Sequence, residues 1–245
     1  DREPGLLYGD GGTGKSLLGL ACLFSLASGE TVAGMQPTEQ AVGPGLYLDW
    51  ETSKDESQER LAALCQGLGL PGPPVVHYER HFRALREIIR SVRKTVDRLN
   101  IQNVIIDSVG GACGGEPETA EVALGFFSAL RQIDANIFAI HHIPKDQKRG
   151  PFGSVYFRNY SRSVWRIKAW QDEEQAGPLK MALFHEKANT GRHHRPIGIQ
   201  ADIEADPDGR WRSVRLTRQD AITSEPEMSE GLTGDIIHHL RENGD

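Results

Sequence analysis

The sequence predicts an α/β protein with a mostly parallel sheet flanked by helices, extended on its C-terminal side by antiparallel strands. Short apolar runs alternate with amphipathic stretches through roughly the first 140 residues, as in chains of βα units. Residues 104–106 are three β-branched residues in a row, which is typical of a strand buried on both faces of a parallel sheet. After Ser163 the apolar runs are separated only by short turns, which favours antiparallel pairing.

The first elements are predicted from their apolar runs and from the glycine, serine and proline residues that flank them. Residues 5–8 are a short apolar strand, and residues 15–27 are an apolar helix that the Ser28-Gly29 pair ends. A Gly-Pro-Gly turn at 43–45 introduces the next strand, residues 46–50. Residues 55–68 place three leucines and a cysteine on one helical face, so we expect an amphipathic helix there.

A proline-rich run at 71–74 ends that helix, and the strand 75–78 follows it. Residues 82–99 form a basic amphipathic pattern that predicts a helix. The strand 104–106 is followed by a helix at 118–133 and by a buried strand at 137–140. The antiparallel strands are expected at 164–169, 179–184, 197–201 and 211–216.

The chain of 245 residues suits one large domain, which we place at residues 1–220. Residues 221–245 are expected to hold a polar linker, 221–230, and a short helix, 232–240. This helix is either the truncated start of a C-terminal module or a terminal helix docked on the core.

Composition excludes some classes of protein. The longest apolar run, residues 17–27, is far shorter than the roughly 20 residues needed to cross a bilayer, so we expect no membrane association. The three cysteines have no metal-ligand spacing, and their odd number argues against a disulfide framework, which favours a reducing cytoplasm. The net charge of -6 is mild, so a nucleic-acid site would have to depend on local charge.

A complete Walker A motif lies between the first strand and the first helix. Its residues are Gly9, Asp10, Gly11, Gly12, Thr13, Gly14, Lys15 and Ser16. Glycines let successive backbone N–H groups converge on phosphates, and the following helix adds the positive end of its dipole. Lys15 would reach the β- and γ-phosphates and the Ser16 hydroxyl would bind magnesium, so the motif predicts ATP with Mg²⁺ as ligand and cofactor.

Acidic and histidine side chains follow the other expected strands. Asp107 closes the strand 104–106, where a Walker B carboxylate would hold magnesium. Glu51 follows the strand 46–50, where it could accept a proton from the attacking water, with Asp49 as the competing base and a solvated loop acid as the plain alternative. Of His141 and His142, we favour His142 as the contact to the γ-phosphate or the attacking water, because His141 completes its strand. The alternatives are a core histidine, which is the more serious one, and a metal ligand.

These motifs together resemble the RecA-like P-loop ATPase superfamily, and most closely its RepA-type hexameric helicases. The resemblance covers roughly residues 4–217 and also includes the segments His141-His142-Ile143-Pro144-Lys145 and Glu186-Lys187-Ala188-Asn189. It implies that Glu51 is the catalytic base, that His142 is a sensor, and that ATP lies between subunits of a ring. Relatives use a Lys-x-Arg element in the neighbouring site. Lys187 fits its lysine, but Asn189 stands where the arginine should be, which leaves Arg192 as the nearest substitute and Arg162 as another.

A basic segment lies between His141 and Trp170. Seven basic residues and one acid give it a local charge of +6, with four aromatic residues interleaved: Phe152, Tyr156, Phe157 and Tyr160. Cations for phosphates and aromatic rings for bases are what single-stranded DNA binding requires. We therefore predict a DNA contact through Lys145, Lys148, Arg149 and Phe152, although residues 156–170 could instead be partly core.

Three functions remain open. The first is an ATP-driven hexameric helicase or translocase on single-stranded DNA, serving plasmid, phage or mobile-element replication. The second is a RecA-fold ATPase that uses ATP as a switch for assembly or regulation without translocation. The third is an interaction module that binds nucleotide without turnover, against which Glu51 and the two histidines argue.

Overall fold

The computed structural model describes residues 4–142, 155–170 and 177–219. These residues form one nine-stranded sheet in the order β3-β2-β4-β5-β1-β6-β7-β8-β9. The strands from β3 to β6 are parallel, and β6 to β9 pair antiparallel, so the predicted architecture is confirmed. The expected linker 221–230 and helix 232–240 lie outside the described residues.

The strands are β1 (Gly5–Gly9), β2 (Gly45–Asp49), β3 (Val76–Arg80), β4 (Asn103–Asp107), β5 (Asn136–His142), β6 (Ser163–Trp170), β7 (Leu179–Ala188), β8 (Ile197–Ala205) and β9 (Trp211–Gln219). The helices are α1 (Lys15–Ser28), α2 (Lys54–Gly67), α3 (Leu85–Leu99), α4 (Val109–Cys113), α5 (Ala120–Leu130) and α6 (Val155–Tyr160), with a 3₁₀ turn at Glu39–Ala41.

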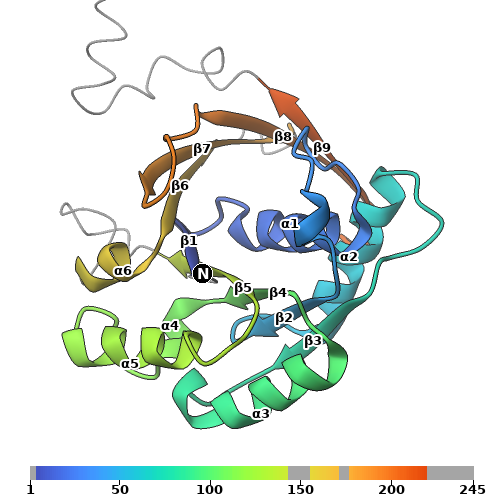
Figure 1. The fold of residues 1–245 in the computed structure, drawn as a ribbon. Coiled ribbons are helices and arrows are strands. Elements are labelled where there is room, and N and C mark those ends of the chain that lie inside the picture. Colours follow the sequence, from blue (N-terminus) through green and yellow to red (C-terminus); the bar gives the residue numbers. More distant parts are fainter. Residues whose placement is uncertain (1–3, 143–154, 171–176, 220–245) are drawn as a thin grey trace, which may run out of the picture.

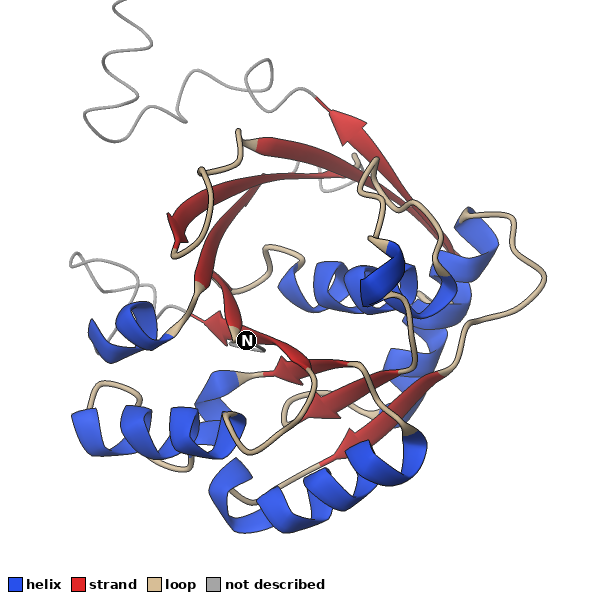
Figure 2. Ribbon diagram, in the orientation of Figure 1, coloured by secondary structure: helices blue, strands red, loops and turns tan. Residues whose placement is uncertain are grey.

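Helices cover both faces of the parallel strands (Figure 2). On one face α3, α4, α5 and α6 enclose a core that includes Leu46, Phe126 and Phe157. On the other face α1 and α2 pack in a second core, and the sheet curls so that β6 to β9 arch over α1 (Figure 1). The second core therefore contains side chains from α1 and from the antiparallel strands together, such as Leu18 and Ile199.

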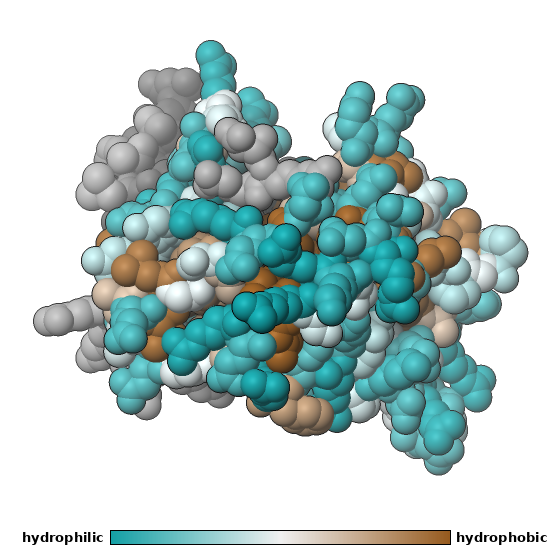
Figure 3. Space-filling view, turned by 60° about the horizontal axis from the view of Figure 1, so that its bottom comes forward, coloured by the Kyte–Doolittle hydropathy of each residue, from teal (hydrophilic) through white to brown (hydrophobic). Residues whose placement is uncertain are grey.

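The outer side of the α3 layer is turned forward in Figure 3, where hydrophilic side chains predominate and hydrophobic ones are scattered. Helix α3 buries Leu85, Ile89 and Val92 at helical spacing, as the amphipathic pattern predicted. It begins at Leu85 and not at residue 82, because Ala84 has an extended backbone and the Phe82 side chain is 81% exposed. Among the described residues no helix is long and apolar enough to cross a membrane.

Several boundaries differ from expectation. Helix α5 is shorter than the predicted 118–133, while β7 and β8 run four residues beyond their predicted ends at 184 and 201. The two short helices α4 and α6 were not predicted. Helix α4 contains the pair Gly110-Gly111, which disfavours a helix by propensity, and it is stabilised by burial of Val109 and Ala112.

Candidate active site at the carboxyl edge of the sheet

The Walker A residues form the loop between β1 and α1, at the carboxyl edge of the parallel sheet. Gly12 and Gly14 have φ angles of 77° and 79°, a region that favours glycine. A Cβ atom on Gly9 would lie 2.4 Å from the Ile167 carbonyl oxygen of β6, and one on Gly14 would lie 2.8 Å from the Met181 sulfur of β7. The antiparallel strands therefore pack closely against the loop and fix its shape.

The Lys15 side chain is buried inside this loop, at 2% exposure. Its ammonium group donates to the carbonyl oxygens of Gly9, at 2.9 Å, and of Asp10, and to the Thr13 hydroxyl at 3.2 Å. Burial lowers the pKa of Lys15 to about 8, and the nearby carboxylates of Asp107 and Glu51 act in the opposite direction. At neutral pH the group is thus mostly cationic, as a phosphate contact requires.

Asp107 ends β4 and is fully buried. The Tyr47 hydroxyl donates to its Oδ2 atom at 2.5 Å. Burial raises the pKa of Asp107, whereas hydrogen bonds from Tyr47 and Ser16 lower it. Ser16 does not satisfy Oδ1, which has no hydrogen-bond partner of good geometry among the described residues. A buried, unsatisfied carboxylate oxygen beside a serine hydroxyl fits the oxygen ligands that magnesium prefers.

Glu51 follows β2 directly, and its carboxylate has two side-chain contacts. The Ser108 hydroxyl donates to Oε1, and Nε2 of His142 lies 3.0 Å from Oε2. The contact with His142 lowers the pKa of Glu51 against the effect of burial, and Ser108 and Lys15 lower it further. The carboxylate is therefore ionised at neutral pH, which is the state in which it can accept a proton.

Strand register explains why these residues meet. In the sheet Asp49 pairs with Asp107, Asp107 pairs with Ile140 and Gly9 pairs with His142, so four parallel strands end within two residues of one another at the same edge. One ligand atom from each of Glu51, Asp107 and His142 lies within 4.8 Å of the others. The sequence-predicted acid, base and sensor candidates are thus brought together beside the Walker A loop.

Asp49, the competing base, has a different position. It is fully buried and accepts hydrogen bonds from the backbone N–H groups of Glu51, at 2.8 Å, and Thr52, at 2.9 Å. The hydroxyls of Thr52 and Tyr78 donate to its other oxygen. With four donors on its two oxygens, this carboxylate holds the chain around Glu51 and has little capacity left to accept a proton.

His141 points into the core and away from this cluster. Its ring is 6% exposed and lies 5.1 Å from the Phe157 ring, centroid to centroid. Burial lowers the pKa of His141 to about 4, with smaller contributions from the charges of His142 and Lys15. The histidine is therefore neutral in the folded protein near pH 7, which agrees with a core residue.

This burial predicts a loss of stability in acid. Between about pH 6.5 and pH 4 the unfolded chain protonates His141 while the folded chain does not, so the stability present above pH 6.5 falls with pH by about 3 kcal/mol. Denaturant unfolding at pH 7 and pH 4 measures the loss of unfolding free energy between the two pH values. This loss should be smaller by about the same amount in His141→Leu than in the wild type, because the other titrating groups are common to both proteins. Equal losses in the two proteins would contradict the assignment.

The residues considered for a neighbouring site lie at the other edge of the sheet. Ala188, beside Lys187, pairs with Ser163, and Ser163 pairs with Gly5 at the start of β1. Arg192 is exposed in the loop that follows β7. Because Gly9 and the Walker A loop lie at the opposite end of β1, Arg192 and Lys187 cannot serve the ATP site of their own chain.

The Lys187 side chain also has a local partner. Its ammonium group donates to the carbonyl oxygens of Arg158, Asn159 and Ser161, at 2.7, 2.9 and 2.7 Å. These are the free carbonyls at the C-terminal end of α6, where a lysine is favoured. Lys187 is thus bound within its own chain. Arg162 donates its backbone N–H to the Pro4 carbonyl oxygen at the same edge.

The aromatic part of the basic segment is packed against the core. Phe157 is fully buried, and Tyr160 lies against Phe127 while Tyr156 stacks on Tyr160. Phe157 is therefore unavailable for stacking on a base, which agrees with the alternative that residues 156–170 are partly core. The predicted contacts Lys145, Lys148, Arg149 and Phe152 lie outside the described residues.

Sequence analysis missed Tyr47, Tyr78 and Thr52, whose hydroxyls bind the site carboxylates. Tyr47 occupies a buried apolar strand and Tyr78 a half-buried edge strand, and in either an aromatic residue ordinarily signals packing. The alternation in β2 and β3 gives no sign that their polar ends turn toward the carboxyl edge.

Comparison with known proteins agrees with this geometry. A sequence profile described as an AAA domain matches residues 1–148. The fold is similar to that of a KaiC-like protein from the hyperthermophilic archaeon Pyrococcus horikoshii, with a TM-score of 0.59, 16% sequence identity and 90% of each chain covered. No curated protein sequence matches this chain. The chain belongs to the AAA domain family and has a RecA-like P-loop fold.

Proposed function

We propose that this protein hydrolyses ATP in a magnesium-dependent reaction at the carboxyl edge of its sheet. The observation that carries the proposal is the convergence of Glu51, Asp107 and His142 within 4.8 Å, next to the buried Lys15. A nucleotide-binding module without turnover would need the lysine and the glycines, but it would not need an ionised carboxylate held by a serine and a histidine.

Each residue has a role in this proposal. Lys15 and the backbone N–H groups of the Walker A loop bind the β- and γ-phosphates. Ser16 and Asp107 would hold magnesium, which when bound neutralises charge on the phosphate oxygens. Glu51 accepts the proton of the attacking water, and His142, which touches Glu51, responds to the nucleotide state.

We further propose that the enzyme works as a ring, as the resemblance to RepA-type hexameric helicases implies, and that it moves single-stranded DNA in the cytoplasm. The exposed position of Arg192 at the edge opposite the ATP site supports a role toward a neighbouring subunit. The local charge of the segment between His141 and Trp170 supports a DNA contact. Lys145, Lys148, Arg149 and Phe152 are its proposed residues.

The second candidate is an ATPase switch that serves assembly or regulation without translocation. The burial of Phe157 and the packing of Tyr156 and Tyr160 favour it, because they leave fewer rings for stacking on bases. The two candidates differ in whether DNA changes the rate of hydrolysis.

Measuring ATP turnover with and without single-stranded DNA, together with the mass in solution, tests both candidates. For the helicase we expect a DNA-stimulated rate and a salt-dependent affinity, with a slope of roughly -2 per subunit from three neutralised phosphates. The triple variant Lys145→Ala, Lys148→Ala, Arg149→Ala should lose the stimulation and flatten this slope. Lys15→Ala, which should not turn over ATP, is the control for contaminating activity.

A wild-type protein that turns over ATP but neither binds DNA nor responds to it would leave the switch as the function. A triple variant that binds DNA with the wild-type affinity and slope would show that the contact lies elsewhere. Turnover by Lys15→Ala at the wild-type rate would contradict the ATP site itself.

A further inference from the structure

Two tyrosines occupy matched positions on neighbouring strands beside the active site. Tyr47 of β2 pairs in register with Tyr78 of β3. Their rings stack with centroids 6.2 Å apart and an interplanar angle of 10°. Tyr47 is 3% exposed and Tyr78 is half-buried at the edge of the sheet.

Each hydroxyl reaches a different carboxylate. Tyr47 donates to Oδ2 of Asp107, whose other oxygen, Oδ1, has no hydrogen-bond partner among the described residues. Tyr78 donates at 2.8 Å to Oδ2 of Asp49. Asp49 in turn accepts hydrogen bonds from the backbone N–H groups of Glu51 and Thr52. The two stacked rings are thus connected to the metal-binding acid on one side and to the backbone of the general base on the other.

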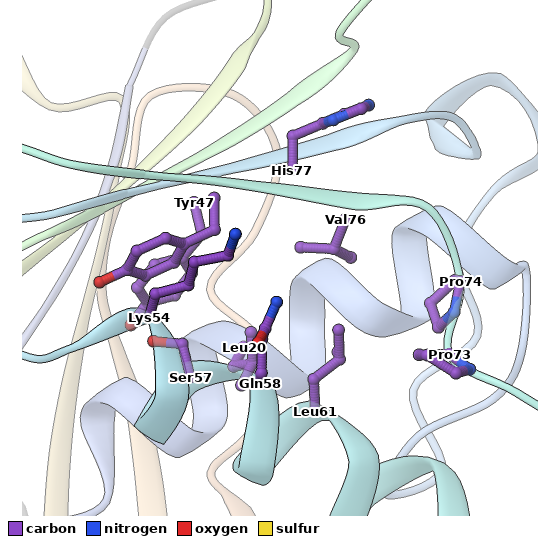
Figure 4. Close-up of a pocket in the computed structure, with 11 residues that line it drawn as sticks. Leu20, Tyr47, Lys54, Ser57, Gln58, Leu61, Pro73, Pro74, Val76 and His77 are labelled. Atoms are coloured by element: carbon purple, nitrogen blue, oxygen red, sulfur yellow. The ribbon is translucent and has the colours of Figure 1, made fainter.

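The two rings also border a cavity. Both line a cavity of about 490 Å³, whose wall is completed by Leu20 of α1 and by Ser57 and Leu61 of α2. Figure 4 shows the Tyr47 ring at one end of this cavity, near Lys54 and Ser57. Beside this cavity, the hydroxyl contacts to Asp107 and Asp49 hold the polar ends of the two side chains.

We propose that Tyr47 and Tyr78 are positioning residues of the ATPase site, with separate tasks. Tyr47 orients the Asp107 carboxylate for magnesium, and Tyr78 acts through Asp49 on the backbone that presents Glu51 to the attacking water. The proposal rests on the proposed hydrolysis of ATP, and it assigns two residues that lie outside the Walker motifs.

The phenylalanine variants test it, because each keeps the ring and removes only the hydroxyl. Tyr47→Phe should raise the magnesium concentration for half-maximal turnover by roughly tenfold, since a hydrogen bond to a charged group is lost. Turnover at saturating magnesium should change much less. Tyr78→Phe should lower turnover at saturating ATP and magnesium by about three- to tenfold while the magnesium requirement stays unchanged.

Positioning predicts that Tyr47→Phe changes mainly the magnesium requirement and that Tyr78→Phe changes mainly the turnover at saturation. A merely structural role would lower thermal stability and change both quantities in each variant. Tyr160→Phe, on the opposite face of the sheet, controls for loss of a tyrosine hydroxyl. A titration of a non-hydrolysed ATP analogue with and without magnesium provides the same comparison without turnover, and the magnesium-dependent gain in affinity should shrink in Tyr47→Phe alone.

Two outcomes overturn the inference by different routes. If wild-type protein turns over ATP and both phenylalanine variants match it in rate and magnesium requirement, the positioning roles are wrong while the ATPase stands. If wild-type protein shows neither turnover nor magnesium-dependent binding of nucleotide, the proposed function falls and the inference falls with it.

Discussion

Glu51→Gln should bind ATP with nearly the wild-type affinity and hydrolyse it ~10²–10⁴-fold more slowly. The amide has the shape of the carboxylate and can still accept from the Ser108 hydroxyl, so the local structure should be kept. It cannot accept a proton from water at neutral pH. The contact with His142 keeps the carboxylate of the wild type ionised, and this is the property that the substitution removes.

The measurement is phosphate release at saturating ATP, with affinity taken from a fluorescence titration of the same preparation. Near wild-type turnover would place the base elsewhere, and Asp49 would be the next residue to test. The four donors that already bind Asp49 argue against that result. Loss of ATP binding in the variant would instead mean that Glu51 is needed to form the site.

Arg192→Ala should lower turnover by ~10³–10⁵-fold if this arginine acts on the ATP of a neighbouring subunit. It lies at the edge of the sheet opposite the Walker A loop, so its effect must come from another copy of the chain. Arg195→Ala, an exposed arginine in the same loop, is the matched control for loss of charge and should be much closer to wild type.

Mixing two inactive proteins tests the direction of this contact. Arg192→Ala subunits keep their own Walker A loop, and Lys15→Ala subunits keep their own arginine, so a mixed interface contains one complete site. We expect turnover to reappear on mixing. A mixture that stays inactive would contradict action between subunits, and an unchanged rate in Arg192→Ala alone would make Arg162 the next candidate.

The parts of the site that the sequence predicted are those where the chemistry requires a local pattern. The Walker A loop needs glycines, a lysine and a serine in fixed order, and Asp107 and Glu51 each follow an apolar strand directly. Because the strands are parallel, their carboxyl ends lie at the same edge of the sheet, and these residues meet there. The motif, the acid and the base therefore follow from the sequence alone.

The parts that were missed depend on contacts between residues far apart in the chain. Nothing local to Lys187 shows that it will cap α6, because α6 lies about thirty residues earlier and forms only by packing Phe157. The hydroxyl contacts of Tyr47 and Tyr78 could not be predicted either, since nothing in β2 or β3 indicates which carboxylate each hydroxyl will reach. Short helices such as α4 are likewise stabilised by tertiary burial more than by propensity.

The curl of the sheet around α1 has a consequence for where this fold can be divided. Side chains of β7, β8 and β9, such as Met181, Ile199 and Leu216, share one core with α1. Met181 also supports the Walker A loop at Gly14. The stretch that matches the AAA domain ends at residue 148, before any of these strands begin. We therefore expect that this stretch does not fold on its own, and that nucleotide binding and the C-terminal strands are gained and lost together in one cooperative transition.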